Sequence, residues 1–188
     1  RLISGYLPTT SGYIEVCGFD VDSEPIEIKK RIGYLPEHNP LPEEMFVREY
    51  LDFVGGMYKV KNITKRVEEI MSLVVLETEA HKKIGHLSKG YRQRVGLAAA
   101  IIHEPEVLIL DEPTSGLDPN QLIEVRALIK NIGREMTVLL STHVMQEVEA
   151  MCDRVVLIKM GKVIADEPTE IFKNRNGGLE AAFKELTS

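Results

Sequence analysis

Residues 107–119 read VLILDEPTSGLDP, and this stretch decides the fold. Its first four residues are all aliphatic, as expected for a strand that is buried on both faces of a parallel sheet. Asp111 and Glu112 follow at once, and Pro113 and Gly116 then favour a turn. Ligands of such sheets bind beyond the carboxyl ends of the strands. The stretch therefore predicts a binding site with two neighbouring carboxylates at the end of a core strand.

A helix cap is the simpler interpretation of these acids, because acidic residues often begin helices. The next helical pattern begins only at Pro119, too far from Asp111 and Glu112 for either to cap it. Asp118 directly precedes Pro119 and is placed as an N-cap should be. We therefore expect Asp118 to cap a helix and the other two acids to serve the site.

The segments around this stretch alternate between helix-like and strand-like patterns. Strand-like runs are 13–21, 31–35, 107–110, 137–141, 154–158 and 162–166; helix-like runs are 88–103, 119–135 and 143–152. Residues 1–7 look like the end of a helix stopped by Gly5 and Pro8. Two amphipathic helical patterns, 43–58 and 63–76, form an insert over 41–85. The alternation predicts an α/β fold whose mostly parallel sheet is covered by helices on both faces.

The composition narrows the class of protein. With 188 residues, 44% of them hydrophobic, the chain can bury a sizeable core. Its net charge of −6 argues against a nucleic-acid partner, because phosphate backbones are bound by basic patches. Cys17 and Cys152 are its two cysteines and form no CxxC pair, which is typical of reduced thiols in the cytosol. No apolar run approaches the ~20 residues that a membrane span needs.

Five short motifs, in this order, resemble those of the nucleotide-binding domain of ATP-binding-cassette (ABC) transporters. They are IGYLPE at 32–37 (the Q-loop), LSKGYRQRV at 87–95 (the LSGGQ signature), VLILDE at 107–112 (Walker B), SGLD at 115–118 (the D-loop) and STH at 141–143 (the switch histidine). The resemblance implies a P-loop NTPase-like fold. Residues 1–40 and 104–188 would form part of a RecA-like ATPase core, and 41–103 the inserted helical subdomain.

Phosphoryl transfer from ATP depends on positioning and on charge stabilisation around Mg²⁺. Two adjacent carboxylates are compatible with such a site when a cation offsets their repulsion. Asp111 is the candidate Mg²⁺ ligand, and Glu112 is the candidate general base that polarises the attacking water. By resemblance, His143 contacts the γ-phosphate and helps to hold that water. A lone histidine is usually structural, but the position of His143 after residues 137–141 favours the catalytic role.

The signature segment also has two interpretations. Ser88 could be an ordinary N-cap, but a helix start with small residues and free N–H groups also binds anions. In the family this helix start faces ATP held by a second nucleotide-binding domain in a head-to-tail dimer. The resemblance thus assigns Ser88, Lys89 and Gly90 to ATP binding, and places Asp118 at the same interface.

Two motifs depart from the family pattern. Glu37 stands where glutamine is typical; an ionised glutamate only accepts hydrogen bonds but can still face Mg²⁺ or water. Lys89 and Tyr91 depart from LSGGQ, and Lys89 adds a positive charge that favours an anion. We keep Glu37 as a candidate ligand of ATP and Mg²⁺.

One expected motif is missing. The sequence contains no G-x-x-x-x-G-K-S/T loop, whose backbone and lysine hold the phosphates of ATP. We expect either a sequence truncated at its N-terminus or a protein that has lost the loop. In both cases the 188 residues alone should bind ATP poorly and not hydrolyse it.

The resemblance implies the ATPase subunit of a transporter, cytoplasmic and peripheral on the inner face of the cell membrane. The helical insert would contact an integral membrane permease subunit. The closing segment is similar to export-type and gliding-motility-type ATPases. Two alternatives stay open: a non-catalytic interaction scaffold, and a soluble ABC-type ATPase of DNA repair or translation.

Overall fold

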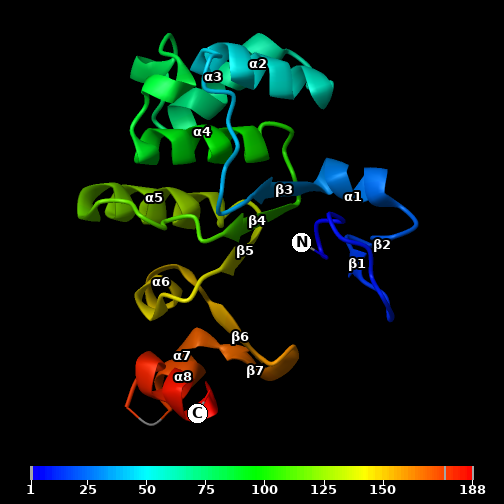
Figure 1. Ribbon diagram of the computed structural model, residues 1–188, viewed down its shortest axis with the longest axis vertical. Helices are drawn as coiled ribbons and strands as arrows, with labels where there is room; N and C mark the ends of the chain where they lie inside the picture. The colour runs from blue at the N-terminus through cyan, green and yellow to red at the C-terminus, as the bar shows by residue number, and fades with distance from the viewer. Residues whose placement is uncertain (1, 176, 188) are drawn as a thin grey trace. The chain divides into compact units, whose positions relative to one another are not determined.

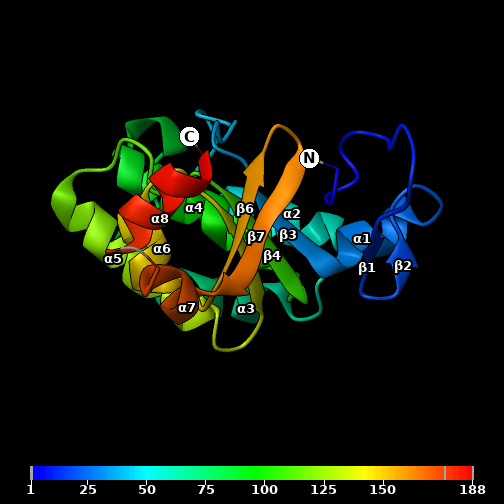
Figure 2. The same ribbon diagram turned by 90° about the horizontal axis from the view of Figure 1, so that it is seen from below.

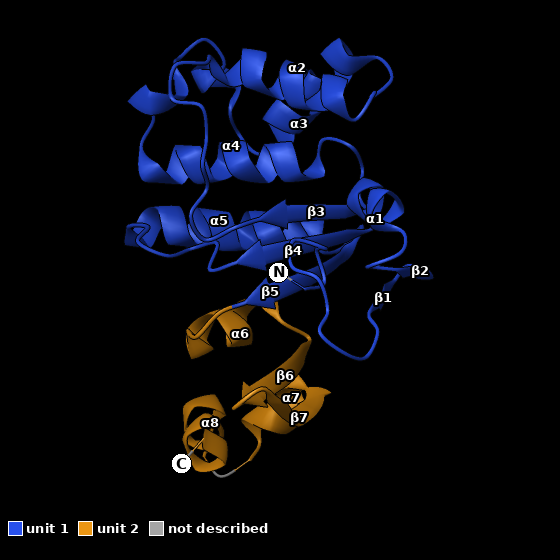
Figure 3. Ribbon diagram, turned by 45° about the vertical axis from the view of Figure 1, so that its right-hand side comes forward, with its two compact units in different colours: residues 1–141 blue, residues 142–188 orange. Residues whose placement is uncertain are grey.

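The computed structural model describes residues 2–175 and 177–187 and divides into two compact units, Arg1–Ser141 and Thr142–Ser188 (Figure 3). We call them unit 1 and unit 2 and describe each by itself. No helix in the described part of the chain is long and apolar enough to cross a membrane.

Unit 1 is built on a parallel sheet of three strands in the order β3, β4, β5. These strands are Ile32–Leu35, Val107–Asp111 and Thr137–Ser141. In the register, Leu35 lies beside Leu110, and Asp111 lies beside Ser141. The central strand β4 has Leu108 and Leu110 fully buried, as its unbroken aliphatic run predicts.

Helices pack on this sheet and on one another. They are α2 (Val47–Met57), α3 (Ile63–Leu73), α4 (Lys89–Ile101) and α5 (Pro119–Ile132), with short 3₁₀ turns at Glu77–Glu79 and Ile84–His86. Figure 1 shows α4 between the sheet and the layer of α2 and α3. Helix α4 is buried along most of its length, since it packs against β3 below and against both insert helices above. The expected α/β fold with a parallel, helix-flanked sheet is confirmed.

Glycine at position 33 lets β3 approach α4. A Cβ added there would overlap the backbone carbonyl oxygen of Ala100 and stand 3.1 Å from Cδ1 of Leu108. Backbone cannot move aside as a flexible side chain can. We expect Gly33→Ala to destabilise unit 1 by about 1–3 kcal/mol through overpacking, measured by urea unfolding. Gly12→Ala, where a Cβ meets no atom within 4 Å but φ is positive, is the control for strain without contact. An equal loss in both variants would contradict this role of Gly33.

The N-terminal part of unit 1 differs from expectation in two places. Residues 2–5 form turns, with the Gly5 N–H bonded to the Leu2 carbonyl at 3.0 Å, so the helix end expected there is wrong. A helix that the sequence patterns did not indicate, α1 (Pro25–Arg31), follows the hairpin of β1 (Glu15–Val16) and β2 (Phe19–Asp20). Helix α1 has only seven residues, too few to show a helical period, and one buried side chain, Ile28.

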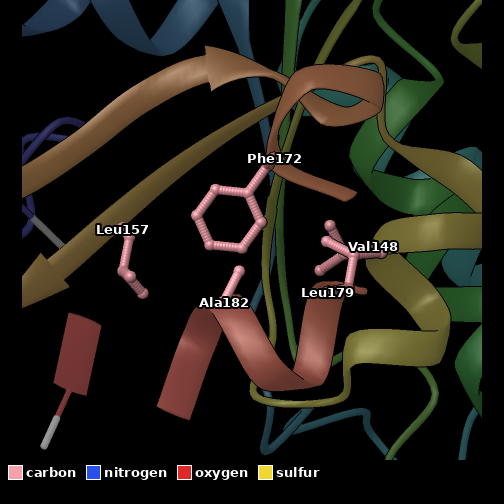
Figure 4. Packing of buried hydrophobic residues seen from close by; sticks show 5 residues of the cluster. All are labelled: Val148, Leu157, Phe172, Leu179 and Ala182. Atoms are coloured by element: carbon pink, nitrogen blue, oxygen red, sulfur yellow. The ribbon is translucent and has the colours of Figure 1, made fainter. Parts of the chain in front are cut away.

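Unit 2 consists of α6 (Met145–Met151), an antiparallel hairpin of β6 (Arg154–Lys159) and β7 (Lys162–Pro168), and the helices α7 (Thr169–Lys173) and α8 (Leu179–Thr187). Figure 2 shows the two hairpin strands side by side. Met160 and Gly161 make the turn with φ of 50° and 75°, as tight hairpins require. The core gathers around Phe172, which is 1% exposed, and comprises Val148, Leu157, Phe172, Leu179 and Ala182 (Figure 4). The division into an ATPase core and a helical subdomain at 41–103 stays a prediction.

Candidate functional site

The carboxyl ends of β3, β4 and β5 meet at one edge of the sheet, because the strands are parallel and in register. Asp111 is the last residue of β4, and Glu112 follows it. Glu37 lies two residues beyond the end of β3. The structure therefore places three of the predicted carboxylates after neighbouring strands at the same edge, where ligands of parallel sheets bind.

The backbone at Glu112 has an uncommon conformation. Its φ of 47° lies in the left-handed region, which costs a non-glycine residue roughly 1–2 kcal/mol. The Glu112 N–H donates to the carbonyl oxygen of Ser141 at 2.9 Å, and its own carbonyl accepts from the Ser115 N–H at 3.1 Å. The end of β5 and the following turn thus fix this residue in place. Other turns of the described chain contain the same conformation, for example at Met160, so it fixes the backbone of Glu112 without by itself assigning a reaction.

The turn after Glu112 leads into α5 through a well-formed cap. Gly116 has φ of 67°, and the Leu117 N–H donates to the Thr114 carbonyl at 3.2 Å. The Oδ1 atom of Asp118 accepts from the backbone N–H groups of Asn120 and Gln121, each at 3.0 Å. The expected N-cap at Asp118 is confirmed. Its role at a dimer interface stays a prediction.

The start of α4 lies against the start of α5. Ser88 caps α4, with its Oγ accepting from the Tyr91 N–H at 3.4 Å. The same Oγ accepts from Nε2 of Gln121 at 3.4 Å. Gly90 is buried, and a Cβ added to it would stand 2.6 Å from Cδ of Gln121. Nothing in the sequence marked Gln121, because only the packing of two helices brings it to the predicted signature segment.

Lys89 also reaches from α4 toward the turn before α5. A Cβ added to Gly116 would overlap the Nζ of Lys89, so this side chain lies over the glycine. Deeper along the same pair of helices, Arg94 binds Glu124 at 2.5 Å and the Val74 carbonyl at 2.9 Å. The structure thus brings Ser88, Lys89 and Gly90 together with the segment 116–121. Their contact with ATP stays a prediction.

The segment that follows β3 is attached to α4. The Nδ2 of Asn39 donates to the Arg92 carbonyl at 3.4 Å, and the lack of a side chain at Gly96 leaves room for Asn39. Glu37 itself is exposed, with its Oε2 3.9 Å from Nδ1 of His38. That contact carries charge only when His38 is protonated, and exposed pairs stabilise little. Glu37 is therefore accessible to a ligand at the strand edge.

His143 belongs to unit 2 and lies two residues after Ser141. The residues on either side of it are tied down. The Thr142 hydroxyl donates to Oε2 of the buried Glu147 at 2.7 Å and accepts from the Val144 N–H at 3.1 Å. A buried carboxylate thus fixes the backbone around the imidazole. The catalytic role of His143 stays a prediction.

Among residues 2–175 and 177–187, no group of three or more His, Cys, Asp or Glu side chains is arranged to hold a metal ion. Mg²⁺ at phosphoryl-transfer sites needs no such group, since one or two carboxylates suffice when phosphate oxygens and water complete its shell. Asp111 at the end of β4, with Glu37 at the same edge, fits that donor set.

A second feature of unit 1 is a cavity of about 510 Å³ between the segment after β3, the helices α2 and α4, and residues 4–6. Several aromatic rings line it, namely Tyr6, Tyr34, Tyr50, Tyr58 and His103, together with polar side chains such as Lys29 and Asn39. The rings of Tyr58 and His103 are stacked, with centroids 3.9 Å apart. Burial lowers the pKa of His103 and raises the pKa of Tyr50. The cavity therefore offers both ring surfaces and polar groups to an occupant.

Comparison with known proteins places this geometry in a family. Residues 1–115 match the family model described as ABC transporter. The chain belongs to the ABC transporter family. Its similarity to the ATP-binding protein NatA of Bacillus subtilis is 38% identity over 168 residues, which cover 87% of this chain and 68% of NatA.

Two further ABC relatives have names that refer to antibiotics. The bacitracin transport ATP-binding protein BcrA of Bacillus licheniformis is 37% identical, over 94% of this chain and 58% of its own length. The daunorubicin resistance ATP-binding protein DrrA3 of Streptomyces coeruleorubidus is 36% identical, over 95% of this chain and 57% of its own. The chain thus spans little more than half of either relative.

Solved ABC structures agree with the fold. One, described as the ATP binding subunit of an ABC transporter, matches with a TM-score of 0.84 and 28% identity, over 99% of this chain and 80% of that one. CbiO1 of Clostridium perfringens, part of the complex cbiONQ, matches with a TM-score of 0.79 and 30% identity, over 92% of this chain and 72% of that one. The resemblance drawn from the five motifs is confirmed.

Proposed function

We propose that the chain is the ATP-binding and ATP-hydrolysing part of an export-type ABC transporter. The observation that carries the proposal is the end of β4, where Asp111 is followed by Glu112 in a left-handed conformation held by Ser141. Family membership supports it. The test is ATP turnover by a Glu112→Gln variant of the complete protein.

In this proposal the carboxylates of the site have different roles. Asp111, with Glu37 at the same edge, would hold Mg²⁺, which neutralises charge on the phosphates when it is bound. Glu112 accepts a proton from the attacking water as general base. His143 holds that water and the γ-phosphate. Glu112 can act on the water without moving its backbone, because the Ser141 carbonyl and the Ser115 N–H fix it.

A second nucleotide-binding domain completes the site. Ser88, Lys89 and Gly90 offer a hydroxyl, a cation and a helix N-terminus to an anion. They would bind the γ-phosphate of ATP held by that partner in a head-to-tail dimer. Asp118 lies one turn from Gln121 at the same surface and would link the two sites.

The permease subunit would dock at the aromatic cavity of unit 1. Its lining comes from α2, α4 and the segment after β3. A helix of the permease subunit that docked there would contact both the helical insert of this chain and the sheet edge near Glu37. A groove lined by aromatic rings suits the apolar face of a short helix. The chain would then lie on the cytoplasmic side of the membrane, as a peripheral subunit.

We expect Val54→Arg to weaken co-purification with the permease subunit about tenfold or more, because docking would bury an added charge that has no partner of opposite sign among the described lining residues. Val54 is half-buried and lines the cavity. The matched control is Phe53→Arg, since the exposed neighbour Phe53 does not line it. Thermal unfolding of both variants checks that α2 stays folded. Undiminished co-purification of Val54→Arg would remove the cavity as the docking site.

Export is proposed on the names of the relatives. Bacitracin transport and daunorubicin resistance are said of BcrA and DrrA3, which match over more than nine-tenths of this chain. We extend to this chain only the general class, the removal of a compound from the cell. ATP-dependent loss of a fluorescent drug from cells that carry the transporter measures it, and accumulation instead of loss would contradict it.

One observation favours a second function. The sequence lacks the G-x-x-x-x-G-K-S/T loop, as a non-catalytic interaction scaffold would. The two adjacent carboxylates Asp111 and Glu112 count against a scaffold, because an interaction surface does not need neighbouring acids at the end of a buried strand. A complete protein that contains no such loop and binds its permease without ATP would establish the scaffold.

A further inference from the structure

Gln121 makes a contact that neither the fold nor the family motifs require. It lies in the first turn of α5, yet its side chain extends to the start of α4. There its Nε2 donates to the Ser88 hydroxyl at 3.4 Å, and its Cδ lies where a Cβ of residue 90 would stand. The lack of a side chain at Gly90 makes this position of Gln121 possible.

The hydrogen bonds that Ser88 already makes determine which further hydrogen bond its hydroxyl can form. A serine hydroxyl accepts two hydrogen bonds and donates one. Both acceptor positions of Oγ are taken, one by the Tyr91 N–H and one by the Gln121 amide, each at 3.4 Å. What remains is the O–H proton, which can be donated to an acceptor outside the chain. Ser88 is exposed, so such an acceptor can reach it.

We propose that Gln121 is a positioning residue that keeps the Ser88 hydroxyl as a hydrogen-bond donor for a phosphate oxygen. This inference rests on the proposed function, in which that oxygen belongs to ATP held by the second nucleotide-binding domain. Gln121 acts through Ser88 and does not contact the nucleotide.

The same residue couples two parts of the dimer surface. The backbone N–H of Gln121 binds Asp118 at 3.0 Å, while its side chain binds Ser88. The side chain of Lys89, from the same helix start as Ser88, lies over Gly116 in the turn before α5. The signature segment and the turn before α5 therefore reach a partner's nucleotide in a fixed relation to each other.

A glutamate at position 121 would reverse the direction of the hydrogen bond between this residue and the Ser88 hydroxyl. A carboxylate of the same shape has no proton to donate and accepts the Ser88 O–H instead, which consumes the donor. It also adds a negative charge near the phosphate. We expect Gln121→Glu to raise the ATP concentration for half-maximal dimer formation about tenfold or more. Gln121→Met keeps the volume without polarity, so the Ser88 proton stays available and the rise should be smaller.

The measurement uses the complete protein in the Glu112→Gln background, where ATP should be hydrolysed only slowly, and follows dimers by analytical ultracentrifugation. At protein concentrations too low for dimers to form, the Gln121 variants should bind a fluorescent ATP analogue as tightly as the unsubstituted protein does. Thermal unfolding of Gln121→Met and Gln121→Glu checks that the helices remain packed.

A double-mutant cycle separates positioning from a merely structural role. If Gln121 acts through Ser88, the effect of Gln121→Glu should be clearly smaller once Ser88→Ala has removed the hydroxyl, because only the effect of the added negative charge then remains. Full additivity of the two substitutions would overturn the inference, as would an effect of Gln121→Glu no larger than that of Gln121→Met. An unsubstituted protein that forms no dimer with ATP would overturn the proposed function as well, so the two failures are distinguishable.

Discussion

A Glu112→Gln substitution in the complete protein should lower the rate of ATP hydrolysis about 10²- to 10⁴-fold, the usual contribution of a general base. Glutamine keeps the volume and the hydrogen-bonding reach of glutamate, but an amide does not take up the proton of the attacking water. The backbone bonds to Ser141 and Ser115 do not involve the side chain, so the turn should keep its conformation. ATP binding and dimer formation should be largely unaffected.

Phosphate release under saturating ATP measures the rate, and equilibrium binding of a fluorescent ATP analogue measures the affinity. Glu135→Gln removes the same charge from an exposed position beyond the end of α5 and should leave turnover unchanged. Turnover within about twofold of the unsubstituted protein, far less than the loss expected when a general base is removed, would exclude Glu112 from this role. A loss of ATP binding in parallel with turnover would instead indicate a structural role for Glu112.

The second large effect concerns the 188 residues by themselves. Isothermal titration with ATP and Mg²⁺ should give a dissociation constant above about 1 mM, which corresponds to less than about 4 kcal/mol of binding free energy. The reason is the missing G-x-x-x-x-G-K-S/T loop, because its backbone N–H groups and lysine supply most contacts to the phosphates. The carboxylates at the end of β4 cannot replace them, because an ionised carboxylate has no proton to donate to a phosphate oxygen.

The matched comparison is a protein that carries such a loop ahead of Arg1. It should bind ATP at least about a hundredfold more tightly than the 188 residues do, with a dissociation constant in the micromolar range. Far-ultraviolet circular dichroism of both checks that the shorter chain is folded. Micromolar affinity of the 188 residues alone would show that the site holds phosphates in some other way.

The sequence predicts the central part of the fold because its patterns there are long and unmixed. The aliphatic run at 107–110 and the run at 137–141 are strands, and the periodic stretches after Ser88 and Asp118 are helices capped by those two residues. Here the local preference, the burial and the turn residues all favour the same structure. The position of Asp111 and Glu112 at the carboxyl edge of the sheet could be predicted because the strands of such a sheet all run in the same direction.

Other features depend on contacts between distant segments and leave no local signal. The left-handed backbone of Glu112 is held by Ser141, from another strand. The pairing of Ser88 with Gln121 needs α4 and α5 to pack together. The division of the chain after Ser141 likewise reflects contacts across the sequence, which no composition change marks.

We propose that the acids after β3 and β4 of one subunit and the start of α4 of the other gather around the terminal phosphate of one ATP. Electron cryo-microscopy of the complete Glu112→Gln protein with ATP and Mg²⁺ tests it most directly. The account predicts a head-to-tail dimer with Asp111 beside the metal and Ser88 of one subunit donating to the γ-phosphate held by the other, at about 2.5–3.0 Å. ATP bound away from the end of β4, or with its γ-phosphate out of reach of Ser88 of either subunit, would contradict it.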